Sequence, residues 1–166
     1  SRTWYPIENY FGILPLIGGS LLVTLGATLI AVPVGIGAAI YIAEIAPRWA
    51  RELLKPLVEA LAGIPSVVLG FIGILVLAHY LRVTLNLWTG LTAFTGSLLL
   101  AAVSLPTIVS VAEDALDAVP RAYRDASLAL GVTQWQTIWH VTLPAARNGV
   151  ITAIMLGIGR TIGETM

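Results

Sequence analysis

Three long stretches of this sequence contain no Asp, Glu, Lys or Arg, and they constrain the fold more than any other feature. They lie between Glu8 and Glu44, between Glu59 and Arg82, and between Arg82 and Glu113. A helix needs about 20 apolar residues to cross a hydrocarbon core about 30 Å thick, so each stretch can span a bilayer. The chain is 57% hydrophobic and 11% charged, whereas soluble domains have roughly 25% charged residues. We therefore predict an all-α membrane protein.

We expect one transmembrane domain over residues 1–166, with about four helices that cross the membrane. The expected spans cover residues 14–43, 57–81, 91–112 and 148–166. A kink is expected at Pro33 and a second one at Gly63 and Pro65, and the third span contains Pro106. The fourth span would measure roughly 28 Å as a helix and reaches the last residue. The chain also begins with Ser1 and has no basic, cleavable signal segment. We therefore interpret the chain as the core of a longer protein.

The distribution of basic residues predicts which loops face the cytoplasm. Two short polar segments, 44–56 and 120–147, share six of them, which are Arg48, Arg51, Lys55, Arg121, Arg124 and Arg147. The opposite side carries Arg2 and Arg82. Because short cytoplasmic loops are enriched in Lys and Arg, we expect both polar segments in the cytoplasm and the chain in a cell membrane.

Several kinds of partner and cofactor are disfavoured by composition. The net charge is zero and no basic block occurs, so we expect no nucleic-acid partner. The chain has no Cys, which excludes a disulfide framework, thiolate chemistry and a Cys-based metal site. We expect neither a cofactor nor a metal.

The region 120–146 is polar although it lies between two apolar stretches. Its first part, from Arg121 to Leu130, has apolar residues at helical spacing, and we expect one buried stripe made of Ala122, Tyr123, Ala126, Ala129 and Leu130. Gly131 would end this helix.

A second short helix is expected after this glycine. Thr133 and Gln136 have the spacing of a capping box, and Trp135, Ile138 and Trp139 would share one face. Leu143 would end the helix because it precedes Pro144. The result is a helical hairpin that either docks a partner or lies on lipid. Its uncharged corner favours docking, since a lipid-binding helix would carry more Lys and Arg.

The spacing within this hairpin resembles a known motif. The segment "DAS" (Asp125–Ser127), Gly131 after three further residues, and "VTLP" (Val141–Pro144) after nine more resemble the EAA motif of ABC importer permeases. The resemblance implies that the hairpin docks an ATPase. It assigns the docking role to six residues, which are Asp125, Ala126, Ser127, Gly131, Leu143 and Pro144.

Other segments narrow the resemblance to the permeases of the Pst phosphate importer, with a lean toward the C-type subunit. They are "EALAGIPSVVLGF" (59–71), "VAEDALDAVPRAYRDASLALG" (111–131) and "GRTIGETM" (159–166). The resemblance implies a type I ABC importer permease core that acts beside a similar A-type permease subunit. It also implies two ATPase subunits, whose closure would rock the spans, and an extracytoplasmic phosphate-binding protein.

Arg160 and Glu164 are the charged pair expected within the fourth span. Arg160 would lie roughly 18 Å from the cytoplasmic end of this helix, and Glu164 follows one turn later on the same face. Charges at that depth normally face a bundle interior or an aqueous path. The pair is either a structural salt bridge or part of the substrate path, in which Arg160 would bind a tetrahedral oxyanion. The Pst resemblance favours the path.

Weaker candidates complete the list. We expect His79 to reach the membrane interface rather than to act as a ligand. Glu59 is expected to pair with Lys55 four residues earlier or to take part in gating beside the expected kink. The hydroxyls of Ser66, Ser104 and Thr107 would satisfy carbonyls freed by the prolines or line the path. The function predicted is a phosphate importer permease. A permease for sulfate, molybdate or phosphonate is the alternative. An intramembrane enzyme is disfavoured, because the sequence has no G-x-S-x-G, no H-E-x-x-H and no pair of intramembrane carboxylates.

Overall fold

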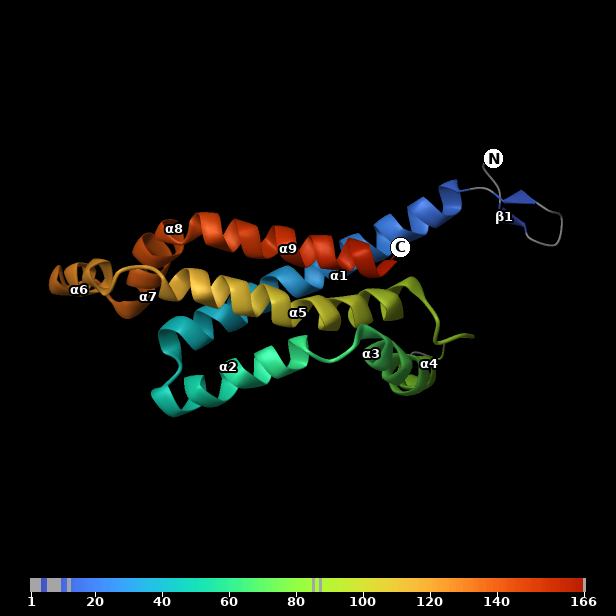
Figure 1. The fold of residues 1–166 in the computed structure, drawn as a ribbon, viewed down its shortest axis with the longest axis horizontal. Helices are drawn as coiled ribbons and strands as arrows, with labels where there is room; N and C mark the ends of the chain where they lie inside the picture. Colours follow the sequence, from blue (N-terminus) through green and yellow to red (C-terminus); the bar gives the residue numbers. More distant parts are fainter. Residues whose placement is uncertain (1–3, 6–9, 12, 85, 87, 166) are drawn as a thin grey trace. The chain divides into compact units, whose positions relative to one another are not determined.

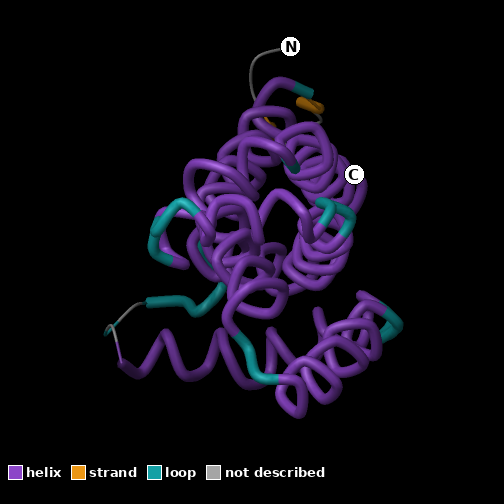
Figure 2. Tube along the Cα trace, turned by 90° about the vertical axis from the view of Figure 1, so that its left-hand side faces the viewer, coloured by secondary structure: helices purple, strands orange, loops and turns teal. Residues whose placement is uncertain are grey.

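The computed structural model describes residues 4–5, 10–11, 13–84, 86 and 88–165. Helix dominates this part of the chain, as Figure 2 shows. The described strands are β1 (Trp4–Tyr5) and β2 (Tyr10–Phe11), which pair antiparallel near the N-terminus. The predicted all-α class is confirmed.

The helices follow one another with short connections (Figure 1). In chain order they are α1 (Leu14–Ile40), η2 (Tyr41–Ile45), α2 (Arg48–Ala62), α3 (Ser66–Ile72), η3 (Gly73–Ala78), α4 (His79–Thr84), α5 (Ala93–Asp117), α6 (Arg121–Ala129), α7 (Gln134–Thr137), η4 (Ile138–Thr142), α8 (Leu143–Ala145) and α9 (Arg147–Thr165). The segments labelled η are π-helical turns, which occur mostly as short interruptions of α-helices.

Within the part of the chain that the structure describes, three helical segments are long and apolar enough to cross a membrane. They are Leu14–Ile45, Ser66–Thr84 and Ala93–Asp117. A fourth segment passes the same test only if two helical parts form one broken span. These parts are Gln134–Ala145 and Arg147–Thr165, and they meet at a bend of 73°. Pro33 and Pro106 lie inside α1 and α5 without ending either helix.

The second apolar helix begins later than the sequence predicts. The segment 44–56 is expected as a polar loop with short helical character, followed by a span from Leu57. In the structure, residues 48–62 form the amphipathic helix α2. The expected kink at Gly63 and Pro65 is a break, because a residue before proline is driven out of the helical region. The helical segment that is long and apolar enough to cross a membrane therefore starts at Ser66.

The chain divides into two compact units, and each is described by itself. The first comprises residues 1–30, 65–103 and 158–166. Within it, α1 and α5 approach each other through small side chains: Ser97 Oγ donates to the carbonyl oxygen of Val23 at 3.2 Å, and a Cβ at Gly96 would lie 3.3 Å from Val23. Close approach through small residues is how helices associate in lipid.

The second unit comprises residues 31–64 and 104–157. Ile108 of α5 is buried against Gly35 of α1 and Gly157 of α9, since a Cβ at Gly35 would lie 2.7 Å from Ile108 and one at Gly157 would lie 2.6 Å from its Cδ1 atom. A buried apolar cluster joins α1, α5, the hairpin and α9, and it consists of Ala39, Ile40, Ala43, Ala112, Leu116, Val119, Ile138, Ala146, Val150 and Ala153. This cluster fixes the base of the hairpin.

Candidate functional site: the hairpin and its ionic network

The hairpin predicted from the sequence is present and has the predicted corner. Gly131 has φ +80°, in the left-handed region that only glycine adopts without strain. Thr133 and Gln136 form the capping box: Thr133 Oγ1 accepts from Gln136 N at 3.3 Å, and Gln136 Oε1 accepts from Thr133 N at 3.1 Å. Both local predictions are confirmed.

The buried face of α6 differs from the predicted apolar stripe. The buried residue is Ser127, whose Oγ lies 2.8 Å from Oγ1 of Thr137 on α7. Tyr123 and Leu130 are exposed, Leu130 by 83%. The two short helices meet through small hydroxyl residues because these allow a close approach, and the larger apolar residues of α6 are left on the surface.

The predicted face of the second helix is divided in the same way. Ile138 enters the core, whereas Trp135 and Trp139 are exposed and pack edge to face with their ring centroids 5.8 Å apart. The prediction places the three residues on one face of the helix. Of the three, Ile138 is buried, and the two indole rings pack together on the surface.

The predicted helix end at Leu143 is also wrong. Leu143 has helical backbone angles, and α8 runs through Pro144 to Ala145 before the chain turns at Ala146. The π-helical turn η4 ends at Thr142, two residues before this proline. Its extra residue shifts the hydrogen-bonding register where Pro144 has no N–H to donate, so that the helix continues.

An apolar hollow opens on the surface of the hairpin. It is lined by Tyr123, Ala126, Ser127, Leu130, Val132, Gln136, His140 and Val141. Of the residues assigned to docking, Ala126 and Ser127 line it, and Asp125 and Gly131 are exposed nearby in the chain. Leu143 packs against the core cluster, and Pro144 is exposed. The hairpin therefore presents part of the predicted motif as a concave surface.

A partly buried ion pair that the sequence does not predict ties the hairpin to η2, at the end of α1. Arg124 Nη2 lies 2.6 Å from Glu44 Oε1, and Nε lies 3.0 and 3.2 Å from the two carboxylate oxygens. Their side chains are 18% and 7% exposed. Arg124 also donates to the carbonyl oxygens of Leu116 and Val119 at 2.8 and 2.9 Å. The two charged residues are 80 positions apart, so no local pattern reveals the pair.

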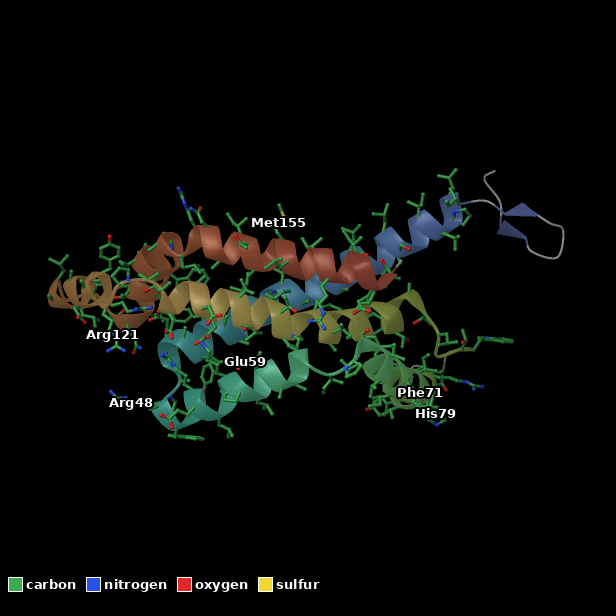
Figure 3. All side chains as sticks on the ribbon, in the orientation of Figure 1. Arg48, Glu59, Phe71, His79, Arg121 and Met155 are labelled. Carbon is green, nitrogen blue, oxygen red and sulfur yellow. The ribbon has the colours of Figure 1, made fainter. Side chains whose placement is uncertain are left out.

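A second ionic cluster joins α2 to α5. Lys55 Nζ lies 2.7 Å from Glu113 Oε2 and 2.9 Å from Asp114 Oδ1. These hydrogen bonds raise the pKa of Lys55 above its usual range, so the ammonium stays charged at neutral pH. The predicted pairing of Lys55 with Glu59 is wrong: Glu59 is exposed on α2 (Figure 3). The acidic partners of Lys55 are Glu113 and Asp114, and both lie on α5.

Glu113 is the most buried acidic residue in this cluster. Its side chain is 2% exposed, and its Oε1 atom has no hydrogen-bond partner within the described part of the chain. A small cavity beside it is lined by Ile42, Lys55, Val58, Glu59, Val109, Ser110 and Glu113. The charge of Glu113 therefore depends on Lys55 for compensation.

Arg160 and Glu164 lie on α9, in the first unit. Arg160 is half-buried and Glu164, one turn later, is exposed. Their roles in the substrate path stay predictions.

The weaker candidates are on separate elements. His79 is exposed on α4 (Figure 3), Ser104 is buried in α5, and Ser66 and Thr107 are half-buried. No group of His, Asp and Glu suited to a metal occurs among the residues that the structure describes.

Comparison with known families decides what kind of protein presents this hairpin. Residues 31–166 match the model of the binding-protein-dependent transport system inner membrane component. The chain belongs to this family of transport permeases. The predicted resemblance to ABC importer permeases is thereby confirmed, and members of the family are inner membrane components of transport systems.

Several permeases are similar to this chain over nearly all of its length. The probable ABC transporter permease protein YqgH of Bacillus subtilis is 44% identical over 100% of this chain and 54% of its own length. The phosphate transport system permease protein PstC of Xylella fastidiosa is 37% identical over 100% of this chain and 57% of its own. The phosphate transport system permease protein PstC 1 of Mycobacterium tuberculosis is 37% identical over 98% of this chain and 54% of its own length. The chain thus spans a little more than half the length of these permeases.

The fold matches that of a solved importer. An inward-facing structure of the MetNI methionine ABC transporter superposes with a TM-score of 0.68 over 98% of this chain and 72% of that chain, at 22% identity. This permease therefore has the type I ABC importer core that the sequence predicted.

Proposed function

We propose that this permease chain is part of the transmembrane subunit of an ATP-driven phosphate importer. The observation that carries the proposal is its 37% identity, over its whole length, to a phosphate transport system permease protein. The exposed hairpin supplies the surface at which such a subunit would meet an ATPase. The chain would perform no chemistry itself, since ATP hydrolysis would belong to the partner.

The proposed complex contains a similar A-type permease subunit, two ATPase subunits and an extracytoplasmic phosphate-binding protein. In this arrangement α1, the α3–α4 segment, α5 and α9 cross the bilayer as one transmembrane domain. The hairpin and α2 lie on the cytoplasmic side, where six Lys and Arg residues of segments 44–56 and 120–147 favour this orientation. Arg160 and Glu164 contribute to the anion path, and phosphate is the anion that Arg160 binds.

The hollow of the hairpin is the proposed docking site, because it combines apolar residues with exposure. Leu130 lines it and is exposed, and an apolar residue that is exposed in the free subunit gains free energy when a partner covers it. A lipid surface would be a poorer match: the corner from Leu128 to Val132 carries no charge, whereas helices that bind anionic lipid are rich in Lys and Arg.

Replacing Leu130 by Asp tests this site. We expect the ATPase bound per permease in detergent to fall at least about tenfold, which corresponds to about 1.4 kcal/mol, because the carboxylate must be desolvated in an apolar contact. The permease itself should remain folded, since Leu130 is exposed. The measurement is co-purification of the ATPase with the full-length permease at matched membrane levels.

Leu128→Asp is the matched control, because Leu128 is exposed near the end of α6, two residues before Leu130, and does not line the hollow. It should retain ATPase binding. Equal loss in the two variants, or none in Leu130→Asp, would show that the hollow is not the docking site.

A further inference from the structure

The end of α1 is held by both helices of the hairpin. Arg124 of α6 binds the carboxylate of Glu44, and Gln134, the first residue of α7, donates from Nε2 to the carbonyl oxygen of the same Glu44 at 2.9 Å. Glu44 lies in η2, the π-helical turn that continues α1. Glu44, at the end of α1, is thus bound by the hairpin through both its side chain and its backbone carbonyl.

The contact made by Arg124 is geometrically constrained, because one guanidinium group makes several hydrogen bonds to different elements at the same time. It engages both oxygens of Glu44 and also the carbonyl oxygens of Leu116 and Val119, near the end of α5. A planar guanidinium holds its N–H groups in a fixed fork, whereas the ammonium of lysine is a point charge on a flexible stem. Arg124 therefore fixes the distance and the angle between α6, η2 and the end of α5.

Burial makes this contact difficult to break during movement. Glu44 and Arg124 are largely shielded from water, and separating a buried pair leaves an uncompensated charge, which is strongly unfavourable. An apolar contact would let helices slide past each other at small cost. A displacement of α6 therefore carries η2 with it.

We propose that Arg124 is the positioning residue through which movement of the hairpin is transmitted to the end of α1. This inference rests on the proposed function, in which the hairpin receives movement from the ATPase. Arg124 does not line the hollow that docks the partner. Its loss should therefore uncouple transport from ATP hydrolysis and leave docking intact.

The test uses the full-length permease with its ATPase, A-type and binding-protein partners in proteoliposomes. ATP hydrolysis and phosphate uptake are measured together. In Arg124→Gln the phosphate transported per ATP hydrolysed should fall about tenfold, while basal hydrolysis and the amount of assembled complex change less than twofold. Arg124→Lys keeps the positive charge but not the planar guanidinium, and its ratio of phosphate transported to ATP hydrolysed should fall about threefold.

Two further variants separate positioning from a general effect. Arg48→Gln removes an equal charge from an exposed position at the start of α2 (Figure 3) and should leave the ratio unchanged. The double variant with Glu44→Gln and Arg124→Gln should reduce the ratio of transport to hydrolysis no further than Arg124→Gln alone, because both substitutions remove the same contact.

The inference is overturned if Arg124→Gln keeps the wild-type ratio, or if hydrolysis and uptake fall in parallel. If Arg124→Gln fails to assemble, the ratio in Glu44→Gln decides by the same criterion. Failure of the proposed function would look different, because the wild-type complex itself would then transport no phosphate.

Discussion

Phosphate uptake is expected to fall at least about a hundredfold when Arg160 is replaced by Gln. A guanidinium binds a tetrahedral oxyanion through two parallel charge-assisted hydrogen bonds, and each such bond contributes about 1.5–3 kcal/mol. The loss of about 2.7 kcal/mol would reduce the affinity of the path for the anion a hundredfold. The measurement is the initial rate of radiolabelled phosphate uptake in cells with matched amounts of permease in the membrane.

Two variants make this result specific. Arg82→Gln removes a charge from an exposed residue of α4 and should keep uptake. Glu164→Gln distinguishes a path from a structural salt bridge: if the pair only holds helices, both Arg160→Gln and Glu164→Gln should lower the amount of assembled complex. Normal uptake by Arg160→Gln would contradict its role.

Replacing Lys55 by Met should destabilise the permease by about 3 kcal/mol, because it strands the carboxylate of Glu113 in a buried site without its partner. The cost is large since Glu113 has one oxygen that is already without a partner in the described part of the chain. The free energy of unfolding is measured in detergent at neutral pH. Since the pKa of Lys55 is raised, the contribution of the pair is complete at neutral pH and is lost only as the pH rises above the usual lysine range.

A second substitution should reverse most of this loss. Adding Glu113→Gln to Lys55→Met removes the stranded charge, so the double variant should be more stable than Lys55→Met and lie within about 1 kcal/mol of the wild type. Arg48→Met, at an exposed position of the same helix, should change stability by no more than about 0.5 kcal/mol. If Lys55→Met costs no more than Arg48→Met, the cluster does not stabilise the unit.

Local chemistry explains which features of the hairpin could be predicted from the sequence. The glycine corner and the capping box each depend on a few adjacent residues, and both are present at Gly131 and at Thr133 with Gln136. The apolar stretches likewise predict the class of fold, because each is long enough for a bilayer. These properties belong to short segments and do not depend on how the helices pack.

The features that were missed depend on contacts between distant segments. Glu44 and Arg124 are brought together by packing of the hairpin against the end of α1. Lys55 binds Glu113 of α5 and not Glu59 of its own helix, because α2 lies close to α5. The exposure of Tyr123 and Leu130 follows from Ser127 taking the buried face of α6. Hydrophobic spacing predicts a helix, but it does not reveal which face of the helix meets the core when apolar residues lie on more than one face.

Anion uptake by a strain that lacks its own phosphate permeases tests the central claim most directly. The strain would express the full-length protein that contains this chain, together with its ATPase, A-type and binding-protein partners. We predict ATP-dependent uptake of radiolabelled phosphate that excess sulfate, molybdate or phosphonate does not reduce. Absence of phosphate uptake, with ATP-dependent uptake of one of those other anions by the same complex, would contradict the claim.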